Sequence, residues 1–138
     1  MAKDLIHNAV GNALEKDGWT IVADPFRLDF KNFALRADLA ARKLTSMEKL
    51  SFASSLKSSR FVGQFVRPRI TASFIGQYQM YQDALILNQL DYTLYLGIGR
   101  DAYKDYFLQS GAEYAIQRYR IKLLVVDTNQ EEISQWIE

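Results

Sequence analysis

The stretch Ile121–Asp127, "IKLLVVD", is a nearly continuous apolar run close to the end of the chain. Such a run predicts a β-strand that is buried on both faces, as in a parallel sheet. Two short helical patterns precede it, at residues 100–109 and 112–120, and a β-branched and aromatic strand pattern precedes those, at Asp91–Gly99. This strand–helix–strand order predicts a parallel pair of strands joined by a right-handed crossover.

A longer helix is predicted upstream, over Ile70–Leu87. Its apolar side chains recur at three- and four-residue steps, which is the spacing of one helical face. Pro68 lies just before it, where proline is tolerated. The recurring positions are Phe74, Ile75, Tyr78, Tyr81, Leu85 and Ile86.

The first half of the chain predicts a helix followed by strands. Asp4 can cap the helix, and Gly18 is a plausible stop. The apolar positions of this helix are Leu5, Ala9, Val10, Ala13 and Leu14. Strand patterns follow at Trp19–Ala23, Phe26–Phe30, Ala34–Ala40 and residues 50–57, although the alanines around Ala34–Ala40 would also suit a helix. We therefore expect an α/β fold with a single mixed β-sheet flanked by helices.

The composition is that of a folded globular protein, with 49% hydrophobic and 24% charged residues among 138. This length suits one domain, so residues 1–138 are expected to fold as a unit. There is no cysteine, which excludes disulfides, thiolate zinc sites and cysteine nucleophiles. The charged N-terminus has no signal-peptide core and no membrane span, so we expect a soluble, cytoplasmic protein.

Positive charge is concentrated in one window of the chain. The formal net charge is only +1, yet no acidic residue occurs between Glu48 and Asp83. The five basic residues of that window are Lys49, Lys57, Arg60, Arg67 and Arg69. Such a cluster can present a basic face to phosphates, and a solvated surface loop is the alternative.

Several common catalytic centres lack the residues that they need. His7 is the single histidine, and its place in the first predicted helix favours a surface or capping role. The seven glycines are scattered, and Gly97–Arg100 does not have the spacing of a phosphate-binding loop. No set of zinc ligands is present. Carboxylate side chains are therefore the remaining candidates for a catalytic or metal-binding site.

Metal-assisted cleavage of a phosphodiester needs carboxylate ligands for Mg²⁺ and a positive group beside the phosphate. An aspartate on one strand and Glu-x-Lys on its neighbour can supply them, because residues two apart on a strand face the same way. Asp38 and Lys57 would fit this pattern, but Ser55 stands where the glutamate should be. Glu15 and Glu48 are the nearest substitutes, and neither is at the motif position.

Gln77 and Tyr81 are four residues apart and share one face of the helix predicted over Ile70–Leu87. They could together meet a nucleic-acid backbone or brace the site. Tyr81 also belongs to the apolar stripe, so packing is the alternative role for it.

The two ends of the chain closely resemble a known family. "MAKDLIHNAVGNALEKDGWTI" at residues 1–21 and "AIQRYRIKLLVVDTNQEEISQWIE" at residues 115–138 resemble the cyanobacterial XisH family, the fdxN-element excision controlling factors. The resemblance implies a fold similar to the PD-(D/E)XK nuclease-like superfamily, with the αβββαβ core of restriction endonucleases. It also implies a part in programmed excision of a DNA element, beside a site-specific recombinase and a small XisI-like protein.

The resemblance also implies roles for individual residues. Asp38 in "RADLAARKL" looks like the motif aspartate, and Lys57 in "SSLKS" looks like the motif lysine, with Ser55 in the place of the glutamate. The other matches are a first-helix acid and a Gln-x3-Tyr motif, namely Glu15, Gln77 and Tyr81.

Two functions are consistent with these features. The first is an accessory factor for DNA-element excision with a degenerate metal site, which needs no cofactor and binds DNA or a partner protein without cutting. Its DNA contacts would be Lys57, Arg60, Arg67, Arg69 and Tyr81. The second is a Mg²⁺-dependent endonuclease in which Asp38 and a migrated acid, Glu15 or Glu48, hold the metal. A third possibility is a structural remnant whose surfaces serve only to form a homo-oligomer, since 13% of the residues are aromatic and leave room for an interface.

Overall fold

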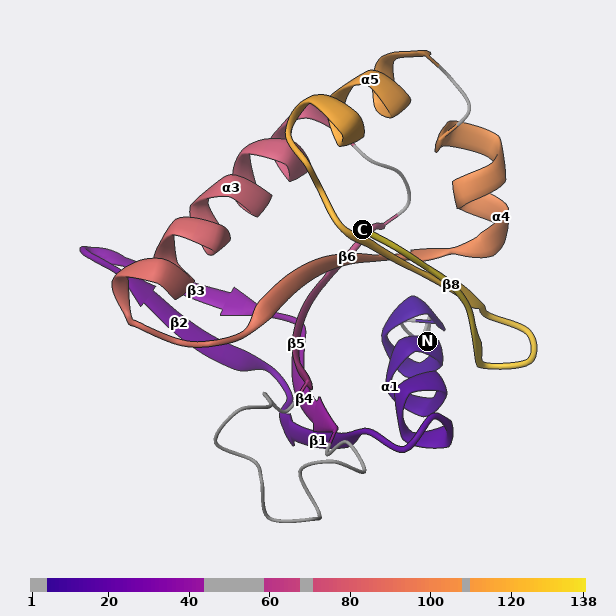
Figure 1. Cartoon of the computed structure of the whole chain (residues 1–138), viewed down its shortest axis with the longest axis horizontal. Helices are drawn as coiled ribbons and strands as arrows, with labels where there is room; N and C mark the ends of the chain where they lie inside the picture. The colour runs from indigo at the N-terminus through magenta and orange to yellow at the C-terminus, as the bar shows by residue number, and fades with distance from the viewer. Residues whose placement is uncertain (1–4, 44–58, 68–70, 108–109) are drawn as a thin grey trace.

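The computed structural model describes residues 5–43, 59–67, 71–107 and 110–138. Within these ranges the chain forms a six-stranded mixed sheet and a separate two-stranded sheet, with helices on both faces of the larger one (Figure 1). The α/β class with a mixed sheet flanked by helices is thereby confirmed. None of the helices in these ranges has the length and apolar character that a membrane span requires.

The elements follow one another in the order α1 (Leu5–Lys16), β1 (Thr20–Ala23), β2 (Phe26–Phe30), β3 (Phe33–Ala37), β4 (Leu39–Lys43), β5 (Ser59–Phe65), α3 (Ala72–Leu87), β6 (Thr93–Gly99), α4 (Arg100–Ala102), the π-helical turn η2 (Tyr103–Phe107), α5 (Ser110–Arg118), β7 (Leu123–Asp127) and β8 (Glu132–Ile137).

The strands of the large sheet lie in the order β1-β4-β5-β6-β7-β8. β5, β6 and β7 are parallel to one another, and the remaining pairs are antiparallel. α3 connects β5 to β6, and the segment from α4 to α5 connects β6 to β7. The parallel pair predicted from Ile121–Asp127 and its upstream strand is confirmed, and β7 is buried at four of its five residues.

α1 covers one face of the large sheet with a stripe of buried residues, Ala9, Val10, Ala13 and Leu14. The helix ends at Lys16, and Gly18 follows at a φ of +94° with its N–H donating to the Glu15 carbonyl, so the predicted glycine stop is confirmed. The assignment of Leu5 to the stripe is wrong. Leu5 is the first residue of the helix, before the packed stripe begins, and it is 72% exposed.

α3, α5 and the small β2–β3 sheet cover the opposite face (Figure 1). The predicted helix is present over Ala72–Leu87, and Tyr78 and Leu85 from its predicted stripe are buried. Thr71 caps it by accepting a hydrogen bond from the Phe74 N–H. The assignment of Ile86 to the buried stripe is wrong, because in the last turn it points away from the core and is 64% exposed.

Two strands differ from the prediction. The single strand predicted around Ala34–Ala40 is two strands, because the chain leaves the small sheet for the large one at Asp38. β5 was not predicted, since Ser59–Phe65 mixes arginine, glycine and glutamine with its apolar residues. β5 is the neighbour of β4, and the strand predicted at residues 50–57 lies outside the described residues.

Gly63 in β5 leaves room for the rings of Phe61 and Phe65, which are both fully buried. A Cβ atom at Gly63 would lie 2.6 Å from Phe65 Cε1 and 2.7 Å from two atoms of the Phe61 ring. Gly63→Ala should therefore lower the free energy of unfolding by about 1–3 kcal/mol, as overpacking of a core does.

Gly76→Ala is the matched control, because a Cβ at this position in α3 meets nothing within 4 Å. It should raise the free energy of unfolding by roughly 0.5–1 kcal/mol through helix propensity. Urea denaturation of the two variants tests both values. Equal effects of the same sign would contradict the close packing at Gly63.

Candidate functional site

Asp38 lies where the chain passes from β3 to β4, and both oxygens of its carboxylate accept hydrogen bonds. Oδ2 accepts from the Phe65 N–H at 2.7 Å. Arg67 donates from Nη2 to Oδ1 at 2.9 Å and from Nη1 to Oδ2 at 3.3 Å. The Asp38 N–H also donates to the Gly63 carbonyl at 2.9 Å. This aspartate therefore ties the junction of the two sheets to the end of β5.

Arg67 is positioned by more than its ion pair with Asp38. Its guanidinium carbon lies 5.7 Å from the centroid of the Phe65 ring, and its Nη1 is 3.4 Å from the Phe65 carbonyl oxygen. A planar guanidinium suits this two-pronged geometry, because it can donate to both carboxylate oxygens at once. The guanidinium of Arg67 therefore neutralises the negative charge of the Asp38 carboxylate by direct contact.

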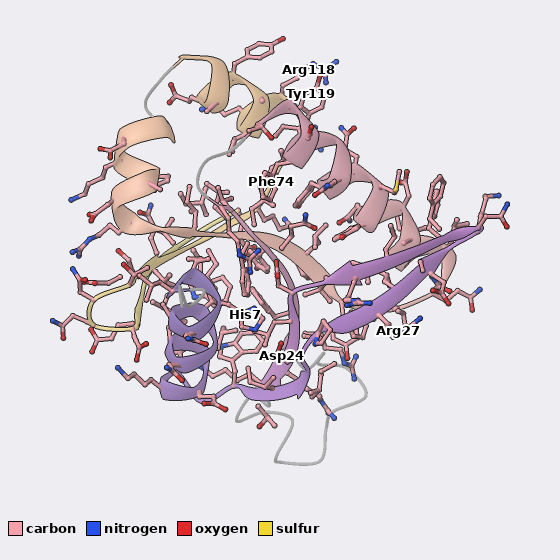
Figure 2. The ribbon with its side chains drawn as sticks, turned by 180° about the vertical axis from the view of Figure 1, so that it is seen from behind. His7, Asp24, Arg27, Phe74, Arg118 and Tyr119 are labelled. Carbon is pink, nitrogen blue, oxygen red and sulfur yellow. The ribbon has the colours of Figure 1, made fainter. Side chains whose placement is uncertain are left out.

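His7 brings α1 to the same place. Its Nε2 lies 2.9 and 3.0 Å from the two carboxylate oxygens of Asp24, and its Nδ1 lies 3.9 Å from Asp38 Oδ1. The ring meets Phe65 edge-on at 5.4 Å. Figure 2 shows His7 and Asp24 facing each other. The surface or capping role predicted for His7 missed these contacts, because its partners lie 17 and 31 residues further along the chain and only the fold brings them together.

On the other face, α3 supplies the predicted pair Gln77 and Tyr81. Gln64 of β5 is 7% exposed, and its Nε2 donates to Gln77 Oε1 at 2.6 Å. Tyr81 donates its hydroxyl to the Arg36 carbonyl of β3 at 3.0 Å. Burial raises the pKa of Tyr81, and the negative charge of Asp38 raises it further, against the opposing effect of the bond to Arg36. Gln77 and Tyr81 thus brace β5 and β3 beside Asp38.

Two of the predicted site residues lie away from Asp38. Glu15 is exposed near the end of α1, eight residues from His7, which corresponds to about 12 Å along a helix axis. Arg60 is near the opposite end of β5 from Phe65, with Nη1 3.8 Å from Asp91 Oδ2.

The remaining predicted residues of the site, Ser55, Lys57, Arg69 and Glu48, lie outside the described residues. No group of three histidine or acidic side chains in the described ranges could hold a metal ion.

The fold and this site define a mixed α/β protein. Its site is an aspartate that forms an ion pair with an arginine at the place where two sheets and a helix meet. The chain belongs to the XisH family, since the family model for "XisH protein" matches residues 1–134. No curated protein matches the chain.

Two solved structures resemble the whole chain. A fdxN element excision controlling factor protein from Anabaena variabilis is 26% identical, with a TM-score of 0.80 over 99% of this chain and 100% of the other. An XisH family protein from Nostoc punctiforme PCC 73102 is 28% identical, with a TM-score of 0.78 over 98% of this chain and 100% of the other.

Replacing Asp38 should show how much its carboxylate contributes to the fold. Asp38→Ala leaves the Phe65 N–H without its acceptor and should cost about 1.5–3 kcal/mol of unfolding free energy. Asp38→Asn keeps one acceptor oxygen and should cost less, because the half-exposed ion pair with Arg67 contributes little by itself. Urea denaturation measures both, and equal losses would show that the N–H bond is not the main contribution.

Proposed function

We propose that this protein is an accessory factor in the programmed excision of a DNA element, and that it binds DNA or a partner protein without cutting DNA. Family membership supports the role in excision, as does the likeness to a fdxN element excision controlling factor from Anabaena variabilis. A small XisI-like protein, a site-specific recombinase and a second copy of the chain are the protein partners that we propose.

The order of elements supports a nuclease-like origin for this fold. α1, β1, β4, β5, α3 and β6 follow the αβββαβ pattern, with the β2–β3 hairpin inserted between β1 and β4. In that arrangement Asp38 directly precedes the second core strand. Ser55 and Lys57 lie outside the described residues, and we propose this second alignment in place of theirs: the third core strand, β5, has Gln64 at the position of the glutamate and Val66 at the position of the lysine. Neither side chain can replace a carboxylate or a lysine.

The occupied carboxylate of Asp38 is the observation that most supports the absence of cleavage. Mg²⁺ relies on carboxylate oxygens and gives up its bound waters reluctantly, so it should bind poorly where the carboxylate is already neutralised. Both oxygens of Asp38 are held by Arg67 and by the Phe65 N–H. The alternative of a Mg²⁺-dependent endonuclease would need a migrated acid, and Glu15 is about two helical turns from His7.

A nicking assay on supercoiled plasmid separates the two functions. Wild-type protein with Mg²⁺ or Mn²⁺ should produce no more nicks than Asp38→Asn, because neither protein holds a catalytic metal. Nicking by the wild type that Asp38→Asn abolishes would establish the endonuclease instead.

Duplex binding is tested by its dependence on salt. If basic side chains contact phosphates, the logarithm of the binding constant should fall linearly with the logarithm of salt concentration, by about 0.9 per contact. Fluorescence anisotropy between about 50 and 200 mM salt measures this slope. An affinity that salt does not change would reject phosphate contact and favour binding to a protein partner alone.

A further inference from the structure

The β2–β3 hairpin forms its own two-stranded sheet and projects from the body of the protein beside α3 (Figure 1). Its inner face is apolar. Leu28 and Ala37 are buried, and Phe26, Phe30 and Leu35 pack against the same core. The residues that alternate with these face the opposite way, so the hairpin has one face fixed by packing and one face in solvent.

Arg27 and Arg36 are direct partners across this hairpin, and both are exposed on its outer face. Side chains directly opposite each other on antiparallel strands have Cβ atoms about 4.5–5.5 Å apart. Like charges in such a pair repel. The alternation of the strands therefore places two guanidinium groups side by side on a packed support.

Neither guanidinium has a carboxylate partner among the residues that the structure describes. Asp29 is two positions along β2 from Arg27 and stands opposite Ala34, and within the described chain it forms no ion pair with either arginine. Other arginines do pair with acids, as Arg100 does with Asp127. Two adjacent arginines without a carboxylate between them favour an anion that both can hold.

We infer that Arg27 and Arg36 together bind a phosphate of the backbone of duplex DNA. Guanidinium forks match phosphate oxygens and can bind them with two parallel hydrogen bonds. A two-stranded ribbon also has the dimensions to lie against a groove of B-DNA. The charge of the hairpin is complementary to DNA, because Arg27, Lys31 and Arg36 outnumber the one acid, Asp29.

The hairpin leads directly into Asp38, the aspartate that Arg67 contacts. Arg36 is two residues before Asp38, and in Figure 2 Arg27 lies on the hairpin to the right of the His7–Asp24 pair. A strand advances about 3.3 Å per residue, so one DNA backbone can pass from the arginine pair to the neighbourhood of Arg67. The inference rests on the proposed binding of DNA and assigns it two residues that the sequence does not indicate.

The test is anisotropy with a labelled 30-base-pair duplex and the variants Arg27→Gln, Arg36→Gln and the double variant. Each single variant should bind at least threefold more weakly and the double variant at least tenfold, and the salt slope of the double variant should fall by about one, because the pair neutralises one phosphate. Arg118→Gln is the matched control. It removes the same charge from an exposed residue of α5, distant from Arg27 in Figure 2, and should bind within twofold of the wild type.

The outcomes separate this inference from the proposed function. Arg27→Gln and Arg36→Gln that bind like Arg118→Gln, in a wild type that does bind the duplex, would overturn the hairpin contact alone. A wild type that binds no duplex would overturn the proposed DNA binding and the hairpin contact with it. Polyglutamate that displaces the duplex as well as unlabelled duplex does would show that the arginine pair takes acidic chains in general, and would overturn its assignment to DNA.

All three variants should fold, because the removed groups are exposed and their loss relieves repulsion between like charges. Their melting temperatures should equal or exceed that of the wild type. A melting temperature that falls would show that the arginines stabilise the hairpin in the free protein, which contradicts a pair that awaits an anion.

Discussion

The contact between the Asp38 carboxylate, the Phe65 N–H and the Arg67 guanidinium joins elements that are far apart in the sequence. Asp38 stands where the chain changes from the small sheet to the large one. Arg67 follows the end of β5, and His7 reaches the same point from α1. The end of a strand, a crossing between sheets and a helix meet at one side chain, so its geometry limits what the site can do.

That geometry also favours binding over cleavage. A metal ion at Asp38 would compete with a guanidinium that already neutralises the carboxylate, and the neighbouring side chain of β5, Gln64, is an amide that bonds to Gln77. Positive charge without a carboxylate partner among the described residues lies on the adjacent pair Arg27 and Arg36. Such a surface, with paired arginines and an aspartate that is already neutralised, would be suited to holding a phosphate backbone.

Much of the fold could be predicted because it follows local patterns. The helix at Ala72–Leu87 has a clear 3.6-residue stripe, and β7 is an unbroken apolar run. β5 could not be predicted in the same way. Its Gly63 is required by the Phe61 and Phe65 rings beside it, so a glycine that resembles a loop signal is in fact a packing requirement. The division of the predicted strand into β3 and β4 at Asp38 could not be predicted either, because it depends on which of the two sheets each part of the segment joins.

Some residues of the candidate site could be singled out from the sequence where a spacing or a motif indicated them. Gln77 and Tyr81 follow from their four-residue interval, and Asp38 follows from a motif. The contact between Asp38 and Arg67 could not be predicted. Arg67 is 29 residues away, and in the sequence it is only one member of a basic window. His7 and Asp24 give no local signal at all, since their contact depends on the docking of α1 against the β1–β2 connection.

The central claim is that Asp38 is held by Arg67 and is not a metal ligand. Paramagnetic broadening of backbone amide signals by Mn²⁺ tests it directly, because the Phe65 amide lies within hydrogen-bond distance of the carboxylate. We predict that millimolar Mn²⁺ broadens the Phe65 signal no more than it broadens amides remote from any acid. Selective broadening at Phe65 and Asp38 would place a metal on this carboxylate and would contradict the claim.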